Sequence, residues 1–185
     1  DESGATTVTL RKNRILRGGV GVRLADHAKS FIKENEIEGC EGVGIDVTTG
    51  AEPDVVGNTL RRCGTDALRI RAGGRGRYQN NVITECGGCG CVIERGAEPD
   101  LRANELHCAA AHGVLVEAGG GGRLSANQIK RSGGVGVGLR EGATTQLRNN
   151  TIAECGGGGV HVAGPGGAIL AENEIVVNLL VGVRL

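Results

Sequence analysis

The chain has 185 residues, and 21 lysines and arginines balance 21 aspartates and glutamates, so its formal net charge is zero. A neutral chain with one tyrosine and one phenylalanine lacks both the basic surface and the stacking rings that nucleic acids require. No apolar run approaches the length needed to cross a membrane. These properties argue against nucleic acid and membranes as partners.

An asparagine returns along the chain with one step of 22 residues followed by six steps of 23 residues. A period of this length is typical of a solenoid built from stacked repeats. The series consists of Asn13, Asn35, Asn58, Asn81, Asn104, Asn127, Asn150 and Asn173. We therefore expect a single repeat domain over residues 1–185, which we interpret as a segment of a longer protein.

Each repeat contains three short apolar segments. In the first repeat, Leu10 lies three places before the asparagine, Ile15 lies two places after it, and a glycine then precedes the alternating pair Val22 and Leu24. Alternation of period two, with glycine and asparagine at the corners, indicates brief strands rather than helices. The sequence predicts an all-β, right-handed parallel β-helix solenoid of about eight coils of 22–23 residues.

Stacked coils would place the asparagines above one another along the axis. We expect their side chains to point inward, with each amide donating a hydrogen bond to the next coil. We also expect the asparagines to take the left-handed backbone conformation that a tight bend demands. An outward row of asparagines that contacts a ligand is disfavoured, because periodic polar residues at a bend usually have a structural role.

Two rows of charged residues run along the outside of the predicted coils. One row, four places before the asparagine, reads Asp54, Arg77, Asp100 and Arg123, and another, thirteen places after it, reads Arg71, Glu94, Glu117 and Arg140. Opposite charges on neighbouring strands stabilise each other. We interpret both rows as solvated faces rather than as a charged binding groove.

The β-helix fold often hosts enzymes that act on polysaccharides, whose sites gather carboxylates and a basic residue on one outer face. Here the outward row eleven places after the asparagine reads Asp46, Arg69, Val92, Leu115, Gly138, His161 and Arg184. One acid and scattered bases provide neither a carboxylate pair nor a calcium cage. No coil carries a long loop that would wall a cleft, and His27 and His161 are interpreted as solitary residues. The sequence therefore predicts no catalytic residue.

A cysteine-rich stretch, Cys86-Gly87-Gly88-Cys89-Gly90-Cys91, has spacing that resembles a metal site, and stacking would place Cys89 beside His112. A zinc site requires four convergent ligands, however. Cys86 instead continues a column of cysteines that act as small buried hydrophobes; the other members are Cys40, Cys63 and Cys155. We predict no metal site and no cofactor, and leave open whether Cys86, Cys89, Cys108 and His112 bind a metal.

The cysteine count is odd, at seven, and the repeat places the cysteines rather than any obvious pairing. This pattern favours reduced thiols, and it predicts a cytoplasmic or nuclear location.

The last repeat replaces its polar turn with an apolar stretch that contains Val176, Val177, Leu179 and Leu180. An apolar turn on the surface of a solenoid is expected to be covered. The two ends of the solenoid would also expose unpaired strand edges. We therefore predict that these four residues contact a protein partner, or that the solenoid associates end to end with further copies.

The segments Gly96–Leu106 and Gly142–Ile152, with Gly113-Val114-Leu115-Val116, resemble the repeats of β-helical F-box proteins and of related carbohydrate-binding-and-sugar-hydrolase-like proteins. The resemblance extends over all eight coils and implies a right-handed β-helix. In the F-box members it implies recruitment of protein substrates.

We accordingly expect a non-enzymatic scaffold that mediates protein–protein interaction, for substrate recruitment or within a larger assembly. The first alternative is a carbohydrate-active β-helix, similar to a polysaccharide lyase, hydrolase or epimerase, with its catalytic coils outside this stretch. The second alternative is a purely structural rod.

Overall fold

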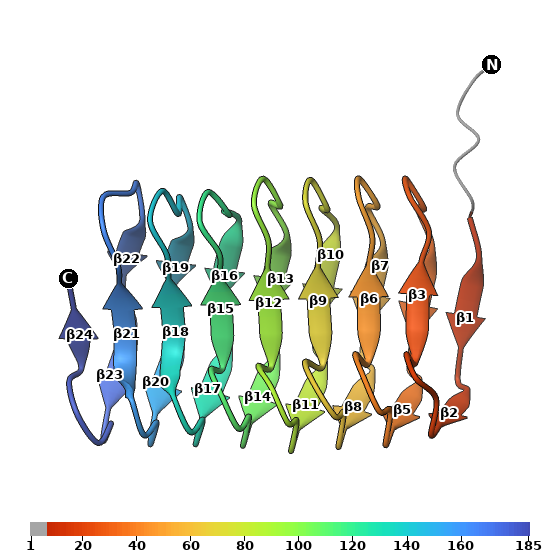
Figure 1. Cartoon of the computed structure of the whole chain (residues 1–185), viewed down its shortest axis with the longest axis horizontal. Helices are drawn as coiled ribbons and strands as arrows, with labels where there is room; N and C mark the ends of the chain where they lie inside the picture. Colours follow the sequence, from red (N-terminus) through yellow and green to blue (C-terminus); the bar gives the residue numbers. More distant parts are fainter. Residues whose placement is uncertain (1–6) are drawn as a thin grey trace.

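The computed structural model describes residues 7–185, which form 24 short strands in three parallel sheets of eight strands each. The sheets wind around a common axis as a stack of coils (Figure 1), and each coil contributes one strand to each sheet. This arrangement confirms the prediction of an all-β parallel β-helix with about eight coils. No helix in residues 7–185 is long and apolar enough to span a membrane.

The strands of sheets A and B all have three residues, and those of sheet C have two to five. Sheet A contains β1 (Thr9–Arg11), β4 (Phe31–Lys33), β7 (Asp54–Val56), β10 (Arg77–Gln79), β13 (Asp100–Arg102), β16 (Arg123–Ser125), β19 (Gln146–Arg148) and β22 (Ile169–Ala171). Sheet B contains β2 (Arg14–Leu16), β5 (Glu36–Glu38), β8 (Thr59–Arg61), β11 (Val82–Thr84), β14 (Glu105–His107), β17 (Gln128–Lys130), β20 (Thr151–Ala153) and β23 (Glu174–Val176). Sheet C contains β3 (Val22–Leu24), β6 (Ile45–Val47), β9 (Leu68–Ile70), β12 (Cys91–Ile93), β15 (Val114–Val116), β18 (Val135–Leu139), β21 (Gly158–Val162) and β24 (Val183–Arg184).

The register of the sheets follows the sequence repeat. Leu101 in β13 pairs with Tyr78 in β10 and with Leu124 in β16, each 23 residues away. Neighbouring strands lie about 4.8 Å apart, so equivalent residues form rows along the axis. The middle residues of the strands in sheets A and B point into the interior, as do the first and third residues of most three-residue strands in sheet C. They form one continuous core with residues such as Ile37, Leu60 and Val114 fully buried.

The asparagines form a hydrogen-bonded ladder inside the corner between sheets A and B, as predicted. Asn58 donates from Nδ2 to Oδ1 of Asn81 at 3.0 Å and to the carbonyl of Ile32 at 2.8 Å. Its backbone N–H donates to the same Oδ1 of Asn81 at 2.9 Å. The same pattern recurs from Asn35 to Asn150. The ladder therefore satisfies polar groups that the bend would otherwise leave unpaired in the interior.

The prediction about backbone conformation at this bend was wrong in one respect. The residue before the asparagine, not the asparagine itself, takes the left-handed conformation, as in Glu34 with φ of 55° and Ala103 with φ of 51°. The ladder asparagines are not among the residues with positive φ. Their role at the corner is hydrogen bonding, while the preceding residue accommodates the turn.

Candidate functional site

The outer face of sheet C presents the row of side chains that the sequence places eleven residues after each asparagine, or ten in the first coil. The row runs Arg23, Asp46, Arg69, Val92, Leu115, Gly138, His161 and Arg184. Residues just before and just after each strand flank this row. We call this surface the sheet C face, and its two halves differ in chemistry.

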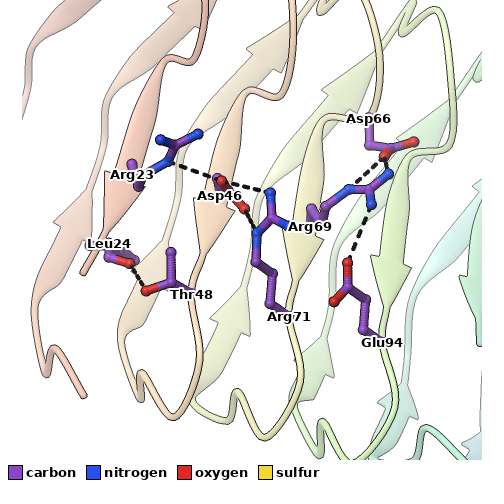
Figure 2. A network of polar contacts seen from close by, with 8 residues as sticks. All are labelled: Arg23, Leu24, Asp46, Thr48, Asp66, Arg69, Arg71 and Glu94. Atoms are coloured by element: carbon purple, nitrogen blue, oxygen red, sulfur yellow. Dashed lines mark hydrogen bonds and ion pairs between the residues drawn. The ribbon is translucent and has the colours of Figure 1, made fainter. Parts of the chain in front are cut away.

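In the first coils, a buried carboxylate organises the sheet C face. The side chain of Asp46 is 1% exposed and binds arginines from the coils on both sides (Figure 2). Nε of Arg71 donates to Oδ1 at 2.7 Å, and Nε of Arg23 donates to Oδ2 at 3.1 Å. Burial alone would raise the pKa of Asp46, but the hydrogen bonds and charges of Arg71 and Arg23 outweigh it and lower that pKa.

A second ion-pair cluster follows along the same face. Nη2 of Arg69 donates to Oδ2 of Asp66 at 2.5 Å, and Nη1 lies 3.3 Å from Oε1 of Glu94 (Figure 2). The other oxygen of Asp66 accepts the backbone N–H of Cys89 at 2.8 Å. The arginines of this half are therefore held by carboxylates of the chain itself, which leaves them poorly available for an acidic ligand.

In the later coils, the sheet C face contains a small hollow of about 40 Å³. Its lining includes His112 from the fifth coil, Arg140 from the sixth and His161 from the seventh, with Leu115 and Gly138 between them. Gly138 lies in the row between Leu115 and His161, and an added Cβ there would contact Leu115 and Val135 at 3.3 Å. The missing side chain of Gly138 therefore leaves the space that the two histidines border.

The ring of His112 is half-buried and fixed by one hydrogen bond. Its Nδ1 accepts the backbone N–H of Val135 at 3.2 Å. Burial, helped by the positive charge of Arg140 and by His161, lowers the pKa of His112, although Glu117 acts in the opposite sense. At neutral pH the ring is thus uncharged, and because Nδ1 accepts a hydrogen bond, its proton is carried on Nε2.

The guanidinium of Arg140 and the imidazole of His161 also border the hollow, and both are accessible to a ligand. Among residues 7–185, neither ring nitrogen of His161 takes part in a hydrogen bond or ion pair, and Arg140 forms no ion pair. Arg184, the register partner of His161, likewise has no ion-pair partner in this part of the chain. The hollow therefore combines a free imidazole, a donor imidazole and a free guanidinium.

His161, which the sequence indicates to be solitary, has no hydrogen-bond partner among residues 7–185 but borders the same hollow as His112. The three polar residues of the hollow occupy different positions of three successive repeats, so no single row of the sequence brings them together. The only sequence signal was the glycine at position 138, which interrupts a row of side chains on the outer face.

The cysteines remain free thiols in the structure, and all but Cys108 are buried. A side-chain hydrogen bond with Cys86, together with burial, raises the pKa of the Cys63 thiol. Cys89 lies against the backbone of His112 and is buried as well. In residues 7–185 no three residues of the metal-ligating types converge on one point.

The predicted contact residues are exposed on the last coil. Val176 is 39% exposed, and Val177, Leu179 and Leu180 are 74–80% exposed. They lie far along the axis from β1 and form an apolar end to the stack (Figure 1). Contact with a partner at this end stays a prediction.

Three solved structures with similar folds are enzymes that act on alginate or mannuronan. The periplasmic alginate epimerase AlgG matches with a TM-score of 0.78 and 14% identity over 91% of this chain and 44% of that chain. A mutant of AlgG gives 0.81 and 15% over the same shares. The A-module of the mannuronan C-5 epimerase AlgE4 from Azotobacter vinelandii gives 0.54 and 15%, over 88% of this chain and 62% of that chain.

These neighbours overturn the prediction of a non-enzymatic scaffold. These three solved structures share the fold and are epimerases, so they favour the carbohydrate-active alternative over the scaffold. At such low identity the likeness itself shows the fold, and this chain spans less than half the length of AlgG. The search among curated proteins found no match.

The comparison with protein families bears on the whole chain. The family described as "Right handed beta helix region" matches residues 2–152 and 100–185, and this match also confirms the predicted handedness. The coil-by-coil register, the buried asparagine ladder and this match lead to one conclusion: the chain belongs to the right-handed β-helix family.

Proposed function

We propose that this chain is part of a carbohydrate-active β-helix that binds a uronate polymer along the later half of the sheet C face. One observation carries the proposal: His112, Arg140 and His161 converge on a single hollow in which Arg140 and His161 have no ion-pair partner. The β-helical neighbours that act on alginate and mannuronan support the same substrate class. The comparisons do not support the resemblance to F-box and sugar-hydrolase-like repeats, and the proposal does not depend on it.

The charges of the sheet C face determine where an acidic polymer binds. Arg23, Arg69 and Arg71 are held by carboxylates, whereas Arg140 and Arg184 are free to pair with sugar carboxylates. A guanidinium binds a carboxylate through two parallel hydrogen bonds. The polymer therefore lies over the fifth to eighth coils, with Arg140 holding the carboxylate of the sugar that lies above the hollow.

Epimerisation at C5 of a uronate removes a proton from the carbon that bears the carboxylate and returns a proton to the opposite face of the ring. The first step requires a base and a cation that stabilises the developing negative charge. In this proposal, His161 takes the proton, Arg140 stabilises the carboxylate as charge develops, and Nε2 of His112 donates a hydrogen bond to the sugar. Solvent, which reaches this open hollow, supplies the returning proton to the other face and takes up the proton held by His161.

The first test measures binding and exchange with mannuronate oligomers. We expect His161→Asn to slow the exchange of the C5 proton with deuterated solvent by about 100-fold, as for loss of a general base. Arg140→Gln should weaken binding by about 10-fold, as for loss of a charge-assisted hydrogen bond. Isothermal titration calorimetry measures the binding, and NMR in deuterated water measures the exchange.

Lys130→Gln is the matched control, because it removes one positive charge from the same coil but on the outer face of sheet B. It should change neither binding nor exchange. If Arg140→Gln binds uronate oligomers as tightly as the unmodified chain, the sheet C face is not the binding surface. If binding persists without any exchange at C5, the chain binds the polymer but does not epimerise it.

The cellular location stays a prediction, cytoplasmic or nuclear, based on the seven free cysteines.

A further inference from the structure

A second hollowed surface lies over sheet A, away from the sheet C face. Two cavities of about 540 and 310 Å³ share Glu98 and Asp100 in their walls, so they form one elongated groove. The groove begins at Lys29 and Phe31 in the second coil and ends at Thr144 and Gln146 in the seventh coil. It therefore runs along the axis of the solenoid, across the strands of sheet A.

The turns between sheets C and A shape this groove with a two-coil period. Pro53 and Pro99 stand at alternate coils, and Gly76 and Gly122 follow in the coils between. An added Cβ on Gly76 or Gly122 would lie 2.3 or 2.4 Å from the carbonyl oxygen of Pro53 or Pro99. Each cavity thus contains one of these glycines, and the two glycines lie about 9.6 Å apart along the axis, twice the spacing of neighbouring strands.

The walls of the groove are highly polar but electrically balanced. The basic lining residues are Lys29, Arg75, Arg77 and Arg123, and the acidic ones are Glu52, Asp54, Glu98 and Asp100. Nε and Nη2 of Arg77 donate to the two carboxylate oxygens of Asp54 at 2.7 Å each, which confirms the predicted pairing at this point of the row. Such a surface offers no net charge to attract a polyanion or a polycation.

The same groups are suited to hydroxyls. The carboxylate of Asp100 accepts hydrogen bonds, the guanidinium of Arg123 donates them, and the amide of Gln146 does both. At the other end, the ring of Phe31 is 37% exposed and lies under Nζ of Lys33 at 5.0 Å. An exposed ring provides an apolar platform for the flat face of a sugar.

From these features we infer that the groove over sheet A binds a neutral, extended, 1,4-linked glycan. The spacing of Gly76 and Gly122, which line one cavity each, corresponds to the two-sugar repeat of such a chain, so equivalent sugars occupy the two cavities. This inference goes beyond the proposed function, because it concerns another face and a ligand without charge. A chain with both surfaces would hold a neutral glycan and an acidic one at the same time.

The test uses linear β-1,4-gluco-oligosaccharides of two, four and six sugars with the whole chain. We expect affinity to rise at least 10-fold from two to six sugars, because only the longer chains reach both cavities. Binding should be unaffected by salt, and amide signals of β10, β13 and β16 should shift in NMR spectra. Asp100→Asn and Arg123→Gln should each weaken hexasaccharide binding at least 5-fold.

Glu105→Gln is the matched control, since it removes one acid from the same coil on the exposed outer face of sheet B. Arg140→Gln separates the two proposals, because it should weaken binding of uronates and leave the glucan unaffected. No binding of the hexasaccharide at millimolar concentration, or binding that Asp100→Asn and Arg123→Gln leave unchanged, would overturn the inference. Signal shifts in sheet A on addition of an extended peptide, with none on addition of glycan, would also overturn it.

Discussion

The carboxylate of Asp46 shows how a single residue on an outer face stabilises this fold. Its side chain is covered by the two arginines that bind it, so the residue is buried although it points away from the core. The arginines themselves stay partly in solvent, at 61% and 39% exposed. Asp46 and its two arginines therefore hold three successive coils together on the sheet C face. None of these charges lies in the apolar interior.

The lowered pKa of Asp46 makes stability depend on pH in acid. Because the folded-state pKa lies below the reference value of 3.8, the contribution is fully present above that value and is lost as pH falls through the folded-state pKa. We expect Asp46→Asn to cost about 2 kcal/mol at pH 7. The cost should shrink as pH falls below 3.8, because the carboxylate of the unmodified chain is then protonated as well and loses its charge.

Urea unfolding at pH 7 and between pH 4 and 2 checks this prediction. Glu85→Gln, at an exposed position, is the control and should unfold as the unmodified chain does at each pH. An Asp46→Asn variant that stays less stable by the same amount at pH 2 as at pH 7 would contradict the electrostatic explanation.

At the scale of one coil, neighbouring coils approach closely at the sheet C corner, where a glycine stands in every coil except the third, which has Ala67. An added Cβ on Gly113 would lie 2.3 Å from Cγ2 of Ile129 and 2.6 Å from the carbonyl oxygen of Gly136. These are atoms of the next coil, one of them in the backbone. At Gly113 the corner therefore has no room for a side chain unless the next coil shifts.

We expect Gly113→Ala to destabilise the fold by about 3 kcal/mol through overpacking. Gly19→Ala provides the comparison, because nothing lies within 4 Å of an added Cβ there, and it should change stability by less than about 1 kcal/mol. The midpoint of urea unfolding measures both. Equal midpoints for the two variants would show that the corner relaxes, contrary to this expectation.

The sequence was sufficient to predict the strands, their order and the asparagine ladder, because each depends on a pattern that repeats in every coil. The bend conformation was not predictable in the same way, since Glu34 and Ala103 have no residue type in common that favours a left-handed backbone. The hollow was missed for a related reason: His112, Arg140 and His161 belong to different rows. Their convergence requires the stacking of three coils and the absence of a side chain at Gly138.

At the scale of the whole molecule, the two ends of the stack are complementary. Asn173 lies at the last step of the ladder, and its Nδ2 donates only to the carbonyl of Leu147, whereas every earlier asparagine from Asn13 onward also donates to the next Oδ1. In the first coil, Arg14 stacks on Glu36, and in the last, β23 begins with Glu174. A second copy placed on the last coil in register would thus set its Asn13 above Asn173 and its Arg14 above Glu174.

This head-to-tail contact is heterologous and does not close on itself, so it would produce filaments rather than a fixed dimer. It would also cover Leu179 and Leu180, which are 79% and 74% exposed. We therefore expect the mass of the chain in solution to rise with concentration. Leu179→Lys with Leu180→Lys should hold it at the mass of one chain at every concentration in analytical ultracentrifugation.

A charge exchange between the two ends tests the register of this contact. Glu174→Arg alone should weaken association, because it would face Arg14 of the next copy, and Arg14→Glu alone should do the same by facing Glu174. In the double variant, Glu174→Arg with Arg14→Glu, opposite charges meet again and association should recover. Recovery in the double variant would be expected only if these two residues meet across the contact; concentration-independent mass for the unmodified chain would refute end-to-end association altogether.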